Sequence, residues 1–330
     1  MGDQIMHKVV VITGASSGAG RATTFELAAH GAALVLASRN EAVLQELAAE
    51  CREIGSEVLV VQTDVTDHSA MRRLAERAFE WKGRIDVWVN NAGVLAAGTF
   101  EEMPWEAHQK VINTNLLGYM SGAYAVLPYF KRQGAGTLIN NISIGGYVAV
   151  PFGGAYTASK FALRGFFESL KGELTDWPDI HVVDLFPAFL DTPGIQHAGN
   201  YTGKVLKPSP PVYDPKIVAH SVRDAILRPA STRYPGGASL LFKIGHSLAP
   251  EWMTKITGLL MKGYFRIAGP AEKTDGNLFR SVDFSMSTNG NSRPRLTPHT
   301  KRILRIGLLT AGVVGLGIYL LSGRNARTSS

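Results

Sequence analysis

The sequence predicts an α/β protein built on a doubly wound parallel sheet, with helices on both faces in three layers. Up to about residue 190, short β-branched apolar runs alternate with amphipathic segments long enough for helices. This alternation is typical of repeated strand–helix units, whose parallel strands are buried on both faces. With 330 residues, 45% of them hydrophobic and 18% charged, the chain can bury a sizeable core.

Six strands and five helices are expected up to about residue 190, and a sixth helix is expected after it. The predicted strands are 8–13, 33–37, 57–62, 86–90, 136–142 and 180–186. The predicted helices are 19–30, 41–54, 69–81, 105–132, 155–176 and 215–227. Proline and glycine punctuate the stretch at about 190–213, which predicts a lid on the substrate side.

The C-terminal part has a different texture. Residues 236–283 are predicted to form an amphipathic helical extension, whose apolar stretch 238–267 carries scattered cations. This stretch could pack on the core or lie against a membrane surface, and both alternatives stay open. A polar linker over 284–302 and a transmembrane helix over 303–321 are expected to follow.

Charge supports membrane attachment. The run Ile306–Leu321 is uncharged, and its glycines suit a membrane helix better than a soluble one. Residues 291–330 contain seven Lys or Arg and no acid, which leaves 27 residues of each sign in the rest of the chain. Most of these cations precede the apolar run, so the large domain is expected on the cytoplasmic side of a single-pass span. A nucleic-acid partner is not expected, because the globular part is net neutral.

Cys51 is the only cysteine in the chain. A single cysteine excludes an internal disulfide and fits a reducing compartment. Because Cys51 lies in a predicted helix, it is interpreted as a structural filler and not as a catalytic thiol.

A glycine-rich turn, TGASSGAG at 13–20, joins the first strand to a helix. Glycines let the backbone approach phosphates, and the free N–H groups at a helix N-terminus attract them. The pattern therefore predicts a pyrophosphate site, although a purely structural turn is the alternative. The residues assigned to it are Gly14, Ser16, Ser17, Gly18 and Gly20.

The ends of the second and third strands indicate which cofactor binds. Ser38 and Arg39 stand where an acidic residue would mark NAD. A guanidinium can pair with a 2'-phosphate, so NADP(H) is favoured, with a solvated surface cation as the alternative for Arg39. Asp64 and Val65 could contact the adenine, or Asp64 could cap the following turn.

The run NNAG at 90–93 ends the fourth strand. Its side-chain amides could brace the sheet, while the backbone of Asn91, Ala92 and Gly93 faces the cofactor. A turn alone is the alternative, because Asn and Gly favour turns.

Tyr156 and Lys160 stand four residues apart, so on a helix they share a face. A nearby ammonium and an oxidised nicotinamide would lower the pKa of Tyr156 and let it act near neutral pH. The spacing is common by chance, and a packed tyrosine beside an exposed lysine is the alternative. Ser143 could hydrogen-bond a substrate oxygen, and Asn115 could hold a relay water for Lys160; a strand-end hydroxyl and a helix-bend amide are the alternatives.

Together, TGASSGAG, NNAG, Asn115, Ser143 and YTASK resemble the short-chain dehydrogenase/reductase family over about residues 7–192. The resemblance implies a Rossmann-type catalytic domain over 1–235 that binds NADP(H). It implies that Tyr156 is the general acid/base and that Lys160 positions the nicotinamide ribose and lowers the pKa of Tyr156. It also implies that Ser143 orients the carbonyl and that Asn115 supports the proton relay.

The resemblance adds Lys160, Pro187 and Thr192 to the expected cofactor contacts. One residue departs from the family pattern, because Ala188 stands where the family often has glycine after proline. Its extra methyl group would narrow the nicotinamide pocket, while Thr192 remains placed to meet the carboxamide.

The expected function is an NADP(H)-dependent oxidoreductase that interconverts a hydrophobic alcohol and its ketone or aldehyde at a membrane. The hydrophobic substrate is inferred from the anchor and from Phe186 and Phe189. Two alternatives are an epimerase or dehydratase of similar fold and a catalytically idle NADP-binding scaffold, both disfavoured by the full set of four catalytic residues. The two long helices or the tail could pair subunits into a homodimer.

Overall fold

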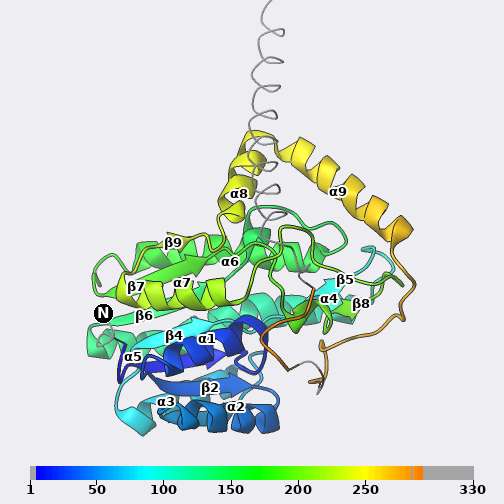
Figure 1. The fold of residues 1–330 in the computed structure, drawn as a ribbon. Helices are drawn as coiled ribbons and strands as arrows, with labels where there is room; N and C mark the ends of the chain where they lie inside the picture. Colours follow the sequence, from blue (N-terminus) through cyan, green and yellow to red (C-terminus); the bar gives the residue numbers. More distant parts are fainter. Residues whose placement is uncertain (1–4, 283, 285, 293–330) are drawn as a thin grey trace, which may run out of the picture. The chain divides into compact units, whose positions relative to one another are not determined.

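The computed structural model describes residues 5–292 except 283 and 285 (Figure 1). The predicted transmembrane helix over 303–321 and the end of the predicted linker lie outside these residues. Among the residues that are described, no helix is both long and apolar enough to cross a membrane.

A seven-stranded parallel sheet forms the centre of the described part, in the order β3-β2-β1-β4-β6-β7-β9. Its strands are β1 (Val9–Thr13), β2 (Ala33–Ser38), β3 (Val58–Gln62), β4 (Val87–Asn90), β6 (Gly136–Asn141), β7 (Ile180–Leu185) and β9 (Thr232–Arg233). The doubly wound sheet is confirmed, and each of the six predicted strands is found within one residue of its expected ends. The strand order reverses between β1 and β4, and ligands bind such sheets at the carboxyl ends of the strands there.

Three short strands have no counterpart in the prediction. β9 pairs with Asp184 and Leu185 of β7, and β5 (Ala96–Ala97) pairs with β8 (Gly199–Asn200) in a separate sheet. Each is two residues long, which is too short to show the alternation that identifies a strand in a sequence.

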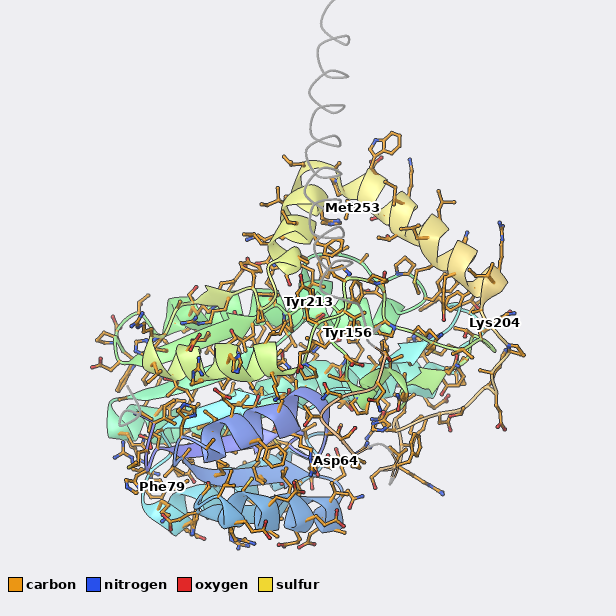
Figure 2. All side chains as sticks on the ribbon, viewed as in Figure 1. Asp64, Phe79, Tyr156, Lys204, Tyr213 and Met253 are labelled. Carbon is orange, nitrogen blue, oxygen red and sulfur yellow. The ribbon has the colours of Figure 1, made fainter. Side chains whose placement is uncertain are left out.

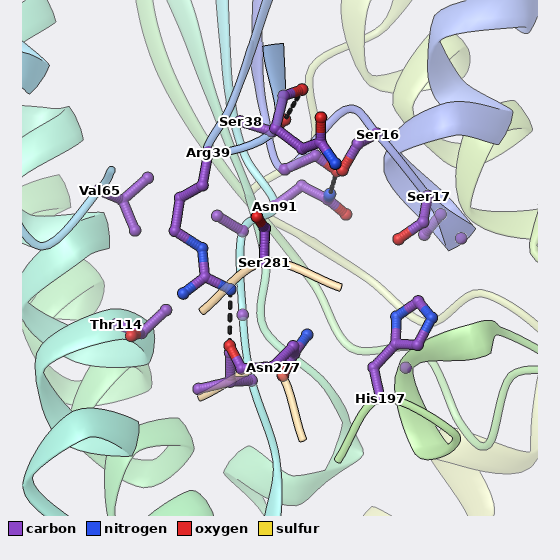
Figure 3. Close-up of a pocket in the computed structure, with 18 of the residues that line it drawn as sticks. Ser16, Ser17, Ser38, Arg39, Val65, Asn91, Thr114, His197, Asn277 and Ser281 are labelled. Atoms are coloured by element: carbon purple, nitrogen blue, oxygen red, sulfur yellow. Dashed lines mark hydrogen bonds between the residues drawn. The ribbon is translucent and has the colours of Figure 1, made fainter. Parts of the chain in front are cut away.

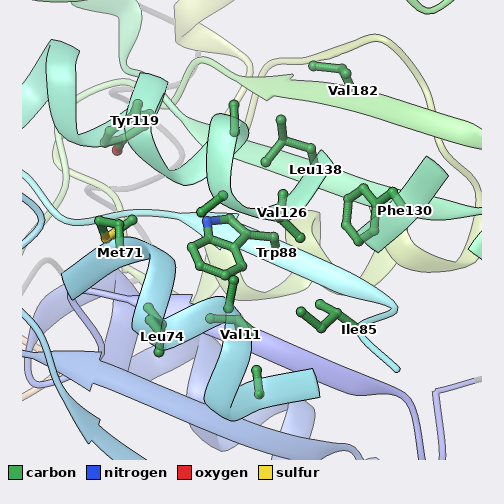
Figure 4. Close-up of a cluster of buried hydrophobic side chains, with 14 of the residues drawn as sticks. Val11, Met71, Leu74, Ile85, Trp88, Tyr119, Val126, Phe130, Leu138 and Val182 are labelled. Carbon is green, nitrogen blue, oxygen red and sulfur yellow. The ribbon is translucent and has the colours of Figure 1, made fainter. Parts of the chain in front are cut away.

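Helices cover both faces of the sheet, because alternate strand side chains point to opposite sides. Val10 and Ile12 of β1 pack toward one layer, and Val9 and Val11 toward the other. Figure 4 shows the second layer, in which Trp88 is fully buried. The first layer contains α1 (Gly18–Ala28), α2 (Glu41–Glu53) and α7 (Lys216–Leu227). The second contains α3 (His68–Lys82), α5 (Gly118–Gln133) and α6 (Gly154–Glu173).

The helix expected over 105–132 is divided. α4 (Trp105–Ile112) passes into a π-helical turn at Asn113–Leu117, and α5 follows. Such turns are rare in proteins, and those that occur often lie at functional sites. This one contains Asn115, one of the predicted catalytic residues.

α8 (Ala238–Leu248) and α9 (Pro250–Ile267) form a helical hairpin, coloured yellow in Figure 1. α8 buries only Ser239, and α9 buries no residue. Neither helix contributes a side chain to the buried core clusters of the described residues, and both alternatives for this stretch stay open.

After the hairpin, the chain returns to the catalytic domain as a segment that we call the strap, residues 270–292 apart from 283 and 285. Leu278 is fully buried in a small core with Met103 and Tyr201. Gly290 N donates to Asp191 O at 3.0 Å, so part of the segment expected as a linker lies against the domain.

Candidate active site

The glycine-rich turn lies between β1 and α1 and forms one wall of a cleft (Figure 3). Gly14 has a φ of 65°, and a Cβ there would lie 2.7 Å from the Cα of Ala92. A Cβ on Gly20 would lie 2.1 Å from the Gly14 carbonyl oxygen. Ser17, the N-cap of α1, makes no side-chain capping bond. The N–H groups of the first turn of α1 receive no bond from the Ser17 side chain, and such groups are suited to bind an anion.

Most of the predicted cofactor residues line this one cleft. They are Gly14, Ser16, Ser17, Gly18, Arg39, Asp64, Val65, Asn91, Ala92, Gly93 and Thr192. The remaining three lie elsewhere: Gly20 packs under Gly14, Lys160 lies beside Tyr156, and Pro187 accepts a hydrogen bond from Ile144 N at 2.8 Å.

The cleft suits a ligand that has both phosphates and polar groups. Three of its buried polar atoms, Thr114 Oγ1, Asn141 Oδ1 and Asn277 Oδ1, have no hydrogen-bond partner among the described residues. A buried polar atom without a partner is costly, so such atoms indicate where a ligand binds. With the N–H groups of the glycine turn, they fit a nicotinamide dinucleotide.

The strap already accepts three hydrogen bonds from two residues of this cleft. Arg39 Nη2 donates to Asn277 O at 2.6 Å and Nη1 to Leu278 O at 3.2 Å (Figure 3). Gly18 N donates to Ser287 O at 2.9 Å. Arg39 is therefore not a solvated surface cation. The strap's carbonyl oxygens bind the donors that the sequence pattern assigns to phosphates.

Asp64 caps the following turn, as one of its two predicted roles requires, and the adenine contact stays a prediction. Its Oδ1 accepts from Thr66 N at 2.9 Å, which caps the turn, and the residue also lines the cleft. Burial alone would raise the pKa of Asp64, but the hydrogen bonds from Thr66 and the charges of Lys110 and Arg39 outweigh it and lower the pKa.

Asn91 holds the glycine turn in place. Its Nδ2 donates to Thr13 O at 3.2 Å and to Gly14 O at 3.1 Å, and its Oδ1 accepts from Asn141 Nδ2 at 2.9 Å. The NNAG side chains thus brace the strand ends, while the Asn91 to Gly93 backbone lines the cleft.

Ser143, Tyr156 and Lys160 converge around Gly145. A Cβ on Gly145 would lie 3.1 Å from Tyr156 Cε1, 3.4 Å from Ser143 Oγ and 3.8 Å from Lys160 Cγ. Ser143 has a φ of 123°, and backbone strain of this kind gathers at active sites. Its hydroxyl accepts from Gly145 N at 3.0 Å and hydrogen-bonds the Tyr156 phenol.

Burial controls the protonation of this pair. It raises the pKa of Tyr156, against the lowering effect of the Ser143 hydrogen bond, and it lowers the pKa of Lys160 to about 7. The pKa of Tyr156 is thus raised in the protein alone, and the lowering expected with an oxidised nicotinamide bound stays a prediction. With a pKa of about 7, Lys160 is only partly protonated near neutral pH. Its Nζ lies 5.7 Å from the Tyr156 ring centroid. Tyr156 is therefore a phenol that can donate a proton.

Asn115 is completely buried in the π-helical turn. Its Oδ1 accepts from Val94 N at 2.8 Å and its Nδ2 donates to Val94 O at 2.9 Å. Because the side chain is committed to Val94, a relay water would have to bind the main chain of Asn115. The relay itself stays a prediction.

Sequence reasoning missed several residues of the site. The Lys160 Nζ lies 5.0 Å from the ring centroid of buried Tyr119, whose hydroxyl donates to Asn141 O at 2.8 Å. Asn141 could have been found, because it ends β6 at the same sheet edge as the NNAG run. No local pattern marks Tyr119. The strap residues Asn277, Ser281, Val282 and Met286, which line the cleft, also have no motif.

Comparisons with known proteins agree with this geometry. A family model for short chain dehydrogenases matches residues 8–200. The chain is 30% identical over 322 residues to the uncharacterized oxidoreductase YxnA of Bacillus subtilis (strain 168), with 94% of this chain and 90% of the relative covered. It is 36% identical over 192 residues to 11-beta-hydroxysteroid dehydrogenase A of Sesamum indicum, with 58% of this chain and 54% of the relative covered.

Among solved structures, an alcohol dehydrogenase from the archaeon Thermococcus sibiricus, complexed with 5-hydroxy-NADP, is similar to this chain. The TM-score is 0.60 and the identity 31%, with 69% of this chain and 95% of that chain covered. Short-chain dehydrogenases bind a nicotinamide cofactor, and the cleft described above is suited to one. The chain belongs to the short-chain dehydrogenase/reductase family and is an oxidoreductase.

Proposed function

We propose that the protein reduces a hydrophobic ketone or aldehyde to its alcohol with NADPH, and that Tyr156 supplies the proton. The observation that carries this proposal is the convergence of Ser143, Tyr156 and Lys160 around Gly145, next to a cleft suited to a dinucleotide. Each of these three side chains, taken alone, could have a purely structural role. Their meeting around one glycine supports catalysis.

The chain's own residues handle the proton. The Ser143 hydroxyl, which hydrogen-bonds the Tyr156 phenol, would orient the substrate oxygen toward that phenol. Tyr156 then donates its proton to the oxygen as the carbonyl carbon accepts hydride, and the products are an alcohol and a phenolate. Lys160, whose pKa is lowered by burial to about 7, can return a proton to Tyr156 near neutral pH. The bound nicotinamide supplies the hydride.

NADPH is preferred over NADH in this proposal because Arg39 can pair with a 2'-phosphate. No acidic residue stands at Ser38 or Arg39 to repel that group. Since Arg39 also holds the strap, cofactor binding would exchange the Asn277 and Leu278 carbonyls for phosphate oxygens.

The proposed substrate is apolar and the proposed location is a membrane. Phe189, after β7, lies beside Phe242 of α8 with ring centroids 6.3 Å apart, which gives the substrate side an apolar wall. The sesame relative's name refers to a hydroxysteroid. The proposed anchor is residues 303–321, with the catalytic domain on the cytoplasmic side.

The test is an assay of purified full-length protein for NADPH oxidation with a panel of ketones and aldehydes. We expect turnover with apolar substrates and much weaker turnover with NADH. Failure of the whole panel would overturn the proposed reaction. Deletion of residues 301–330 should move the protein from the membrane fraction toward the soluble fraction, and unchanged distribution would overturn the proposed anchor.

A further inference from the structure

The α8–α9 hairpin carries large apolar side chains that no described residue covers. Trp252 is 72% exposed, Leu259 70% and Ile267 85%. We call the exposed apolar residues of the two helices the outer face: Leu240, Leu241, Ile244, Leu248, Trp252, Ile256, Leu259, Leu260 and Ile267. At 3.6 residues per turn, the members on each helix fall on one side of it. A surface of this kind indicates an interaction site.

Cations border the outer face. On α9, Lys255, Lys262 and Arg266 lie along one edge of the apolar side, and Glu251 is the only acid in the helix. An apolar stripe flanked by Lys and Arg is the pattern of a helix that lies in the interface of a membrane with anionic lipids.

The opposite sides of both helices contact the loops around the active site. Phe265 of α9 stacks edge-on against Phe152, with ring centroids 5.0 Å apart, and Phe152 stands four residues before Tyr156. Tyr264 Oη donates to Val205 O, in the segment predicted to form the lid, at 2.7 Å. On α8, the Lys243 ammonium donates to Tyr234 Oη at 2.7 Å. The hairpin is therefore attached on the substrate side, and Figure 2 shows its corner, at Met253, away from the sheet.

We propose that the outer face lies in the surface of an anionic lipid bilayer and that the substrate reaches Tyr156 from that bilayer, along the inner side of the hairpin. The substrate class is then a carbonyl compound that partitions into lipid. This inference rests on the proposed reductase function and specifies the source of its substrate.

A bilayer fits the outer face better than a second copy of the chain. In a two-fold dimer the same patch meets itself, so three cations on each copy would approach one another with a single acid per copy to offset them. A bilayer with anionic headgroups complements those cations. The chain also carries the uncharged run Ile306–Leu321, C-terminal to the described residues.

The first measurement uses full-length protein reconstituted into vesicles that contain brominated lipids, which quench tryptophan on contact. We expect quenching of Trp252, measured as the difference between wild type and Trp252→Phe, and stronger quenching with phosphatidylglycerol than with phosphatidylcholine alone. Lys255→Glu should reduce that lipid preference. Absence of Trp252 quenching would overturn the proposal.

The second measurement compares two substrates in the same vesicles, a long-chain ketone and a short water-soluble ketone. We expect the double variant Leu259→Glu, Leu260→Glu to lower kcat/KM for the long-chain ketone by roughly tenfold or more, because two apolar side chains leave the lipid. Turnover of the short ketone should stay unchanged. The matched control is Ile54→Glu at the C-terminal end of α2, outside the hairpin, where the apolar side chain is 53% exposed; it should change neither turnover.

The outcomes separate this inference from the proposed function. If wild type reduces neither ketone, the reductase function fails. If it reduces both and the hairpin variant affects them equally, the route from the bilayer fails. If the variant instead converts a dimer to a monomer in analytical ultracentrifugation without Trp252 quenching, the outer face binds a second copy and the proposal is overturned.

Discussion

α6 and α9 are helices of similar length, 20 and 18 residues, with very different surroundings. α6 packs against the sheet and buries Leu163, Phe167 and Leu170, along with Lys160 of the active site. α9 buries nothing, although its apolar residues also gather on one side. The difference shows that the same helical periodicity serves a core in one region and an external surface in the other. The two helices differ in whether the sheet packs against their apolar side.

The same contrast separates the catalytic region, residues 5–235, from residues 236–292. In the first, the catalytic side chains are packed among the elements of the domain, and burial changes the pKa of Tyr156 and of Lys160. In the second, the hairpin is exposed and the strap is held by a few long-range contacts. Substitutions in the catalytic region should therefore reduce catalysis, and substitutions in residues 236–292 should weaken the attachment of the strap or the hairpin.

The largest effect is expected for Tyr156→Phe. Removal of the hydroxyl eliminates the proton donor, so kcat should fall by about 10²–10⁴-fold. NADPH binding, measured by cofactor fluorescence, should be retained. The control is Tyr124→Phe on α5, where the side chain is 68% exposed. Equal activity of the two variants would show that Tyr156 does not act in catalysis.

Arg39→Ala tests whether the guanidinium that holds the strap also selects NADPH. Loss of the guanidinium removes a charge-assisted contact worth about 1.5–3 kcal/mol, so the preference for NADPH over NADH should fall by roughly 10–100-fold. The control is Arg72→Ala, an exposed arginine of α3 that does not line the cleft. If both cofactors weaken equally, Arg39 serves the strap and not a 2'-phosphate.

Gly276→Val tests how firmly the strap is attached. Gly276 has a φ of 54°, and a Cβ there would lie 2.3 Å from His197 O. Backbone strain and overpacking together should lower the free energy of unfolding by about 2–4 kcal/mol in urea titrations. Gly172→Ala on α6, where a Cβ meets nothing within 4 Å, should instead stabilise by about 0.5–1 kcal/mol. Equal stabilities would mean that the strap is not part of the folded unit.

A pH dependence of stability is expected at Lys160. Its folded pKa, lowered by burial to about 7, lies below its ordinary value of 10.5. Below pH 7 both states hold the proton, and the cost of the buried charge is fully present. Between pH 7 and 10.5 only the unfolded state keeps the proton, so stability rises with pH.

Lys160→Met removes this cost. The variant should therefore melt at a higher temperature than wild type at pH 6, and the gain should shrink by pH 9, as measured by circular dichroism. A gain that is independent of pH would contradict the lowered pKa.

The catalytic region could be predicted because its information is local. Each strand of the sheet shows its own apolar run, and the glycine turn, the NNAG run and the Tyr156 to Lys160 spacing each lie within a few neighbouring residues. β9 was missed because two residues, Thr232 and Arg233, carry no periodicity.

The strap could not be predicted, because its contacts join distant parts of the chain. Arg39 meets Asn277 across 238 residues, and neither residue signals the other. The direction of the pKa shift at Tyr156 also depends on the packing around it. Desolvation by the surrounding residues outweighs the hydrogen bond from Ser143, and the sequence alone does not show that burial.

Deuterium transfer tests the central claim most directly. Full-length enzyme would be given NADPH deuterated at both C4 positions with an apolar ketone in ordinary water, and the alcohol would be examined by mass spectrometry and proton NMR. The account predicts one deuterium on the carbinol carbon, with the hydroxyl proton drawn from Tyr156 and exchanging with water. An alcohol without deuterium at that carbon, or cofactor left unoxidised while the ketone is consumed, would contradict it.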